Sequence, residues 1–141
     1  NQLAGLKPGD SFLEIGCGDG RVAAMIAKQN PECSVVGVEL FWPIFLIAKV
    51  RQCFWRLPNL KIQLRNAYWL DWSQFNVVYV FGIIETLNDK IKKQALTQMK
   101  PSAKLVSYAF SMKEWPGEIV QKKSLVNSKL KISQYKIPET T

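Results

Sequence analysis

A glycine-rich turn between a strand-like run and a helix-like run constrains the fold of this chain more than any other feature. Residues 11–17, SFLEIGC, predict a buried strand, and residues 19–30 carry apolar side chains at helical spacing. Gly16, Gly18 and Gly20 fall at every second position where the two segments meet. Such glycines let backbone approach a ligand at a helix start, and a tight structural turn explains them as well.

Strand-like and helix-like segments alternate along the rest of the chain. The predicted strands are 11–17, 34–40, 60–67, 77–83 and 103–110. The predicted helices are 19–30, 41–57 and 85–99. This alternation predicts an α/β fold, with a Rossmann-like, doubly wound, mostly parallel sheet and helices on both faces.

The pattern changes after residue 110. Residues 118–126 and 129–137 alternate apolar and polar side chains on either side of Asn127 and Ser128. Two polar residues between two such runs predict a C-terminal antiparallel β-hairpin at one edge of the sheet. A chain of 141 residues is expected to form a single domain over residues 1–141.

Composition excludes several kinds of chemistry. The chain has no histidine and three scattered cysteines, Cys17, Cys33 and Cys53. This excludes a histidine base and leaves a poor zinc set, so no metal site is expected. Scattered thiols without a signal peptide predict a reducing, cytoplasmic location. The apolar block at 41–48 is too short for a membrane span of roughly 20 residues, so no transmembrane segment is expected.

The net charge of +8 is unevenly distributed. Residues 1–85 hold 8 basic and 7 acidic side chains, whereas residues 86–141 hold 11 lysines and 4 acids. Such a basic half can face nucleic acid, an acidic protein or an anionic membrane surface. A lysine-rich solvated exterior explains the same charges.

Two acids separate the ligands that a glycine turn can hold. Glu39 ends the second predicted strand 19 residues after Gly20, where an acid commonly holds a ribose diol. The spacing GxGxG differs from the dinucleotide fingerprint GxGxxG, and no Gly-Lys-Ser/Thr of a P-loop follows. Glu14 would repel a pyrophosphate and could face an ammonium, while Arg21 could offset a carboxylate. These features favour S-adenosylmethionine over NAD or a phosphate.

Asn66-Ala67-Tyr68 closes the third predicted strand, a point that lies beside the adenine in this fold. Asn66 can hydrogen-bond the adenine amino group, and Tyr68 offers an aromatic face. A polar turn with one buried aromatic residue is the alternative interpretation.

The stretches EIGCGDGRV, GVEL, RNAYWLD and NVVYVFG together resemble class I S-adenosylmethionine-dependent methyltransferases over nearly the whole chain. The DGR ending, the VVYVFG strand and the segment KPSAKLVSYAF followed by a tryptophan are similar to small protein-lysine methyltransferases. That group includes a broad-specificity archaeal enzyme and mitochondrial enzymes that modify the ATP synthase c subunit and the adenine nucleotide translocase.

The resemblance implies S-adenosyl-L-methionine as cofactor and a protein lysine as acceptor. The implied cofactor-binding residues are Glu14, Gly16, Cys17, Gly18, Gly20, Arg21, Glu39, Leu40, Asn66, Ala67, Tyr68 and Phe81. Phe41-Trp42-Pro43 stands where the family often has Asn-Pro-Trp, and Asn66 replaces a usual Asp. The chain does not begin with Met, and the family's N-terminal substrate-gating segment does not precede residue 1, so an N-terminal segment could be missing from this sequence.

The acceptor is expected at the carboxyl ends of the fourth and fifth strands. A narrow aromatic slot is predicted there from Phe81, Gly82, Phe110 and Trp115, with Ile83 beside it. Glu85 could orient an ammonium there or cap a helix start. Phe81 and Phe110 as core residues are the alternative. An RNA methyltransferase and a catalytically weak interaction module remain as rival functions.

Overall fold

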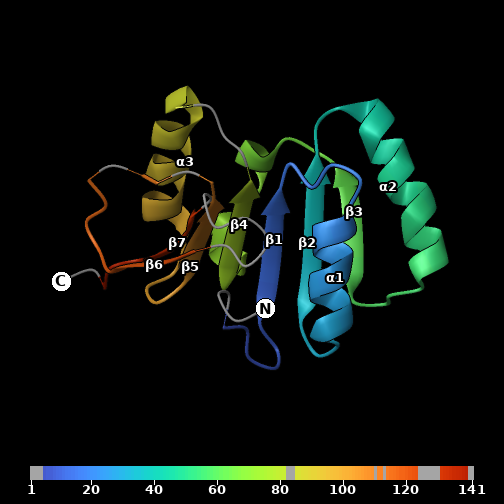
Figure 1. Cartoon of the computed structure of the whole chain (residues 1–141), viewed down its shortest axis with the longest axis horizontal. Helices are drawn as coiled ribbons and strands as arrows, with labels where there is room; N and C mark the ends of the chain where they lie inside the picture. The colour runs from blue at the N-terminus through green and yellow to red at the C-terminus, as the bar shows by residue number, and fades with distance from the viewer. Residues whose placement is uncertain (1–4, 82–84, 110, 113, 124–130, 140–141) are drawn as a thin grey trace.

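The structure is a computed structural model that describes residues 5–81, 85–109, 111–112, 114–123 and 131–139 (Figure 1). Its strands are β1 Ser11–Ile15, β2 Ser34–Glu39, β3 Leu60–Leu64, β4 Val77–Phe81, β5 Lys104–Tyr108, β6 Ile119–Lys123 and β7 Lys131–Lys136. Its helices are α1 Arg21–Gln29, α2 Trp42–Trp55 and α3 Glu85–Gln98, with short 3-10 turns η1 Ala67–Trp69 and η2 Trp72–Gln74.

The strands form one sheet of seven in the order β3-β2-β1-β4-β5-β7-β6. The first five strands pair in parallel, and β7 pairs antiparallel with both β5 and β6. The predicted mostly parallel α/β sheet with a C-terminal antiparallel hairpin at one edge is therefore confirmed. The predicted turn at Asn127 and Ser128 lies outside the described residues.

Two apolar cores lie on opposite faces of the sheet, because neighbouring side chains along a strand point to opposite sides. In β1, Phe12 belongs to the core that contains Ala23 of α1 and Ala48 of α2. The next residue, Leu13, belongs to the core that contains Ile91 of α3. Helices α1 and α2 thus cover one face and α3 covers the other, as predicted.

The observed elements are shorter than the predicted ones at their carboxyl ends. The first strand ends at Ile15 and the third at Leu64, each two or three residues before the predicted end. The residues that follow turn away from the sheet, either into the glycine loop or into η1. These early ends expose loop backbone at one edge of the sheet.

The chain order creates a crevice at that edge. From β1 the chain moves to β2 and β3 on one side, and it then returns to β4 on the other side of β1. Ligands of open α/β sheets bind at such a switch point, beyond the carboxyl ends of the strands. The loop after β1, the end of β2 and the end of β4 all lie there.

Candidate functional site

The glycine loop after β1 presents bare backbone to open space. Gly16 and Gly18 adopt positive φ angles of 66° and 56°, a conformation that favours glycine. A Cβ atom built on either one would meet no heavy atom within 4 Å. Nothing in the described protein therefore fills the space beside these two residues, and backbone there can contact a ligand.

Gly20 has a different role. Its φ is 80°, and an added Cβ would lie 2.6 Å from Cδ1 of Ile62 and 3.3 Å from the Trp55 ring. Gly20 is thus needed where the start of α1 packs closely on β3 and α2. All three glycines were predicted to bring backbone close to a ligand, but Gly20 allows close packing between elements of the protein instead.

Glu14 lies buried in β1 below the glycine loop, with 4% of its surface exposed. Its Oε2 atom has no hydrogen-bond partner among the described residues. Burial, together with the nearby Asp19 and Glu39, raises the pKa of Glu14 to about 8, although the Ala23 backbone amide opposes the shift. A buried carboxyl without a partner is costly, and a cationic ligand group would relieve that cost.

Glu39, the last residue of β2, holds the loops around the crevice. Its Oε2 atom accepts a hydrogen bond from the Gly18 amide at 2.9 Å. Its Oε1 atom accepts from the amides of Leu40 at 2.8 Å and Phe41 at 2.9 Å. A carboxylate offers about four lone-pair positions, so one remains for a ligand hydroxyl in this arrangement.

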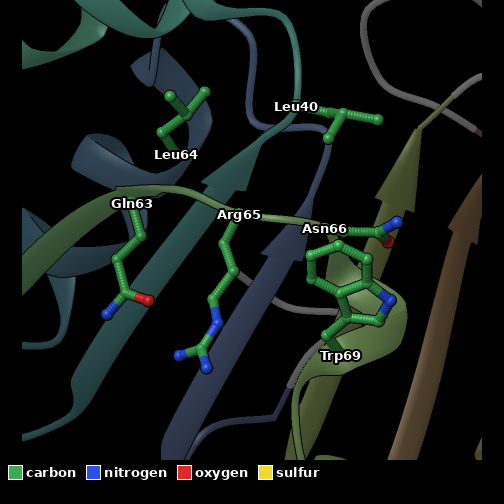
Figure 2. Close-up of a pocket in the computed structure, with 6 residues that line it drawn as sticks. All are labelled: Leu40, Gln63, Leu64, Arg65, Asn66 and Trp69. Carbon is green, nitrogen blue, oxygen red and sulfur yellow. The ribbon is translucent and has the colours of Figure 1, made fainter.

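A pocket of about 570 Å³ opens beside the end of β3 (Figure 2). It is lined by Leu40, Gln63, Leu64, Arg65, Asn66 and Trp69. Leu40 and Asn66 were both predicted to bind the cofactor, with Asn66 at the adenine, and both line this pocket. Trp69 was not among the predicted site residues. It is 78% exposed and lies beside Asn66 in Figure 2. Its place in the run AYWL was the available signal.

The predicted adenine residues have distinct surroundings. Asn66 caps η1, since its Oδ1 atom accepts from the Tyr68 amide at 3.0 Å, and this leaves its amide nitrogen as a donor. Ala67 is buried, and Tyr68 packs partly against the α3-side core. Burial raises the pKa of Tyr68. Trp69, and not Tyr68, therefore supplies the aromatic wall of the pocket.

Arg21 forms an ion pair with Asp19, with 2.8 Å between Nε and Oδ2. Asp19 also bonds Arg51 of α2, so it links the glycine loop to that helix. Burial alone would raise the pKa of Asp19, but hydrogen bonds from the two arginines outweigh it and hold the pKa below its usual value. The predicted role of Arg21 toward a ligand carboxylate thus competes with Asp19.

The side chain of Cys17 is buried and turned away from the open space beside the glycine loop. Its thiol packs against Gly37, where an added Cβ would come within 3.0 Å of the sulfur. Burial, with Glu14 and Glu39 nearby, raises the pKa of Cys17 to about 12. A buried, protonated thiol is inert, so the side chain of Cys17 belongs to the core.

An aromatic pair marks the other side of the crevice. Phe81, at the end of β4, is 58% exposed. It stacks on Tyr108, at the end of β5, with 5.3 Å between ring centroids. Tyr79 lies beside Glu14 in the strand register, and its pKa is raised by burial and by the charges of Glu14 and Tyr108. Neither Tyr79 nor Tyr108 was among the predicted site residues.

Trp115 was predicted to line an open acceptor slot, but its side chain lies in the core. It is 7% exposed and packs on Tyr135 at 5.0 Å between ring centroids. Its indole nitrogen donates to the Lys136 carbonyl at 3.0 Å. Of the other predicted acceptor residues, Gly82, Ile83 and Phe110 lie outside the described residues. Glu85 begins α3, and nothing further is described of its side chain.

No three His, Cys, Asp or Glu side chains of the described ranges lie close enough together to hold a metal ion. Helices of the described ranges are also too short or too polar to cross a membrane.

The sequence matches a known family over most of its length. Residues 14–119 match the sequence profile of the ANTKMT methyltransferase domain. A protein-lysine N-methyltransferase from Saccharolobus islandicus (strain REY15A) is 25% identical over 127 residues, which cover 85% of this chain and 75% of that protein. The match to the family profile begins at Glu14 and includes the glycine loop, Glu39 and Asn66.

Solved structures share the fold. An RNA methyltransferase from Salinibacter ruber in complex with S-adenosyl-L-homocysteine superposes with a TM-score of 0.84 at 22% identity, over 99% of this chain and 88% of that one. PKMT2 from Rickettsia typhi in complex with AdoHcy gives a TM-score of 0.63 at 22% identity, over 81% of this chain and 24% of that one.

The residues at the crevice fit a methyl-donor nucleoside. The unpartnered Glu14 oxygen suits an ammonium, and the open space beside Gly16 and Gly18 suits a ligand against backbone. Glu39 suits a ribose hydroxyl, and the pocket with Asn66 suits a purine. With the match over residues 14–119, the chain belongs to the ANTKMT methyltransferase domain family and is a class I methyltransferase.

Proposed function

We propose that this chain uses S-adenosylmethionine to methylate a lysine side chain of a protein. The observation that carries the proposal is the aromatic pair of exposed Phe81 on half-buried Tyr108, across the β1–β4 junction from the glycine loop. The similarity to a protein-lysine N-methyltransferase, at 25% identity, supports the same acceptor. The family of the matching domain supports it as well.

On the donor side, the residues of the chain bind and orient the cofactor. Glu14 would face its ammonium, backbone at Gly16 and Gly18 would lie along the methionine part, and Glu39 would accept from a ribose hydroxyl. The pocket at Asn66 would take the adenine. When bound, S-adenosylmethionine supplies a methyl group on a positively charged sulfur, which becomes a neutral thioether as the methyl group leaves.

On the acceptor side, the aromatic pair would hold the methylene stem of a lysine and attract its ammonium through the ring faces. A lysine with a pKa near 10.4 must first release a proton to provide a lone pair. Removal from water and a nearby positive charge both favour the neutral amine, so solvent can take the proton. The aromatic pair would align the neutral amine for in-line attack on the methyl group that the cofactor would supply. This fits a chain without histidine.

RNA is a second candidate acceptor. Eleven lysines against four acids in residues 86–141 provide positive charge for a phosphate backbone. The exposed ring of Phe81 can also stack on an unpaired base. The name of the Salinibacter ruber neighbour, an RNA methyltransferase, agrees with this alternative.

Radiolabelled S-adenosylmethionine distinguishes the two acceptors. The chain is incubated with cell extract and label, and the macromolecular product is digested with protease or with RNase before acid hydrolysis. Label that is released by protease and recovered as methyl-lysine supports the proposal. Label that survives protease and is lost with RNase would assign the activity to RNA instead.

Matched variants show that the label comes from this chain. Glu39→Ala removes the predicted ribose anchor and should abolish incorporation. Glu32→Ala is the control, because Glu32 is an exposed acid that lies just before the start of β2, whereas Glu39 ends that strand. Incorporation by Glu39→Ala at the control level would contradict the assigned donor site.

A further inference from the structure

Helix α2 turns an apolar face away from the sheet. Ala48 is its buried residue. Trp42, Leu46, Ile47, Val50 and Phe54 are 50–79% exposed. With about 100° between successive residues, these five positions form one continuous stripe along the helix. We call this stripe the α2 face.

The α2 face is unusual for a surface helix, which normally directs polar side chains to solvent. Large contiguous apolar surfaces on proteins mark sites of interaction. The apolar surface continues at the helix start, where Leu40 and Phe41 are 68% and 58% exposed. Leu40 joins it to the pocket near Leu64 and Trp69, which are 49% and 78% exposed.

The α2 face lies at one side of the molecule. Helix α2 packs beside β3, which is the edge strand of the sheet (Figure 1). The opposite edge of the sheet is formed by β6. A flat partner can therefore approach α2 from the side without meeting the hairpin.

The segment that carries the α2 face is rich in basic residues. Residues 40–70 contain five basic residues and no acidic residue. Arg51 is paired with Asp19. The other four, Lys49, Arg56, Lys61 and Arg65, are exposed. An apolar stripe with aromatic residues and four exposed basic neighbours is complementary to a bilayer that carries anionic headgroups.

We propose that the α2 face docks this protein onto the surface of an anionic lipid membrane. The helix has 14 residues and is about 21 Å long, shorter than the hydrocarbon core of about 30 Å. It would therefore lie in the plane of the interface, with Trp42 and Phe54 among the acyl chains and headgroups. Lys49, whose amine lies 6.0 Å from the Phe45 ring centroid, can extend to the headgroups.

Flotation with lipid vesicles tests this proposal. The chain is mixed with phosphatidylcholine vesicles that contain or lack phosphatidylglycerol. We expect flotation with the anionic vesicles, a weaker signal as salt is raised, and little binding to phosphatidylcholine alone. The double variant Leu46→Glu/Phe54→Glu should lower the floated fraction about tenfold or more.

Ile119→Glu is the matched control, because Ile119 is a 43% exposed apolar residue on β6 at the opposite edge. It should float like the unaltered chain. A charge-reversal pair, Lys49→Glu/Arg56→Glu, leaves the apolar residues in place and should also weaken anionic binding. Circular dichroism and S-adenosylhomocysteine binding check that each variant is folded.

Three results would overturn the proposal. One is the absence of flotation with anionic vesicles, and another is an equal loss of binding in Ile119→Glu. The third comes from sedimentation velocity without lipid: a dimer that Leu46→Glu/Phe54→Glu dissociates would assign the α2 face to a second copy of the chain.

Discussion

The Glu39 carboxylate accepts a hydrogen bond from the Gly18 amide at 2.9 Å, which ties the end of β2 to the loop after β1. The two residues are 21 positions apart in the chain. One side chain thus orders the backbone that would contact the methionine part and also faces the expected ribose. Loss of this carboxylate should therefore affect ligand binding in two ways.

Glu39→Gln should weaken the binding of S-adenosylhomocysteine about tenfold to a hundredfold, as measured by calorimetric titration. The amide keeps one acceptor oxygen but sets an NH₂ group against a backbone amide, and it removes the charge from the remaining bonds. Glu32→Gln should bind like the unaltered chain. Equal affinities of the two variants would contradict the role given to Glu39.

Glu14 should make stability depend on pH. Its pKa is about 8 in the folded protein against 4.5 in the unfolded chain, so the folded state binds more protons between these values. The free energy of unfolding should therefore fall as pH rises through this window, by about 1.4 kcal/mol per pH unit from this group. Urea unfolding of Glu14→Gln should have a flatter pH profile, whereas a profile unchanged from the parent would show that Glu14 does not titrate this way.

Ligand binding should release a proton near neutral pH. Glu14 is mostly protonated there, because its pKa is about 8, and an ammonium beside it would favour the carboxylate. Calorimetric titration of S-adenosylhomocysteine in buffers of different ionisation enthalpy measures this release. Glu14→Gln should show less release than Glu32→Gln. Proton uptake by the unaltered chain would exclude an ammonium at Glu14.

Two glycines of the loop should respond differently to substitution. Gly20→Ala places a methyl group 2.6 Å from Ile62 and should lower stability by about 2–4 kcal/mol from overpacking and a positive φ. Gly16→Ala, whose Cβ meets nothing within 4 Å, should cost only about 1–2 kcal/mol. Its larger effect should be on cofactor affinity, because the methyl group enters the ligand space. Thermal unfolding and calorimetric titration of both variants separate the two roles.

Substitutions of two aromatic residues, exposed Phe81 and buried Trp115, test the acceptor side. Phe81→Leu changes an exposed ring and should raise KM for the acceptor with little change in the unfolding free energy. Trp115→Phe removes a buried indole and its bond to the Lys136 carbonyl, and should cost about 1–3 kcal/mol of stability with KM unchanged. A raised KM in Trp115→Phe alone would return Trp115 to the acceptor slot.

Much of the architecture follows from local patterns. Apolar runs of strand length alternate with helical spacing, and this predicts a parallel sheet because each crossover needs a helix or a long loop. The hairpin of β6 and β7 follows from two alternating runs without a helix between them. Element ends were less accurate: β3 stops at Leu64 because η1 begins at Ala67 and draws the chain off the sheet.

The candidate donor site was also visible in part. Glu14, the glycines and Glu39 lie at the ends of two strands, and strand ends of a parallel sheet meet at one edge. Trp69 was missed because an exposed tryptophan after Asn66 has no periodicity to mark it. Trp115 was misplaced because an aromatic residue in a loop can turn inward or outward, and its partner Tyr135 comes from a strand 20 residues later.

The sequence by itself determined the order of strands and helices, the positions where backbone must turn through glycine, and the acids at strand ends, because these depend on neighbours in the chain. The tertiary structure decided which of these residues meet. It placed Glu39 on Gly18, buried Glu14 without a partner for Oε2 among the described residues, packed Gly20 on Ile62 and left the apolar face of α2 exposed. Burial and long-range contacts arise only when distant segments pack together, so no local pattern could have specified them.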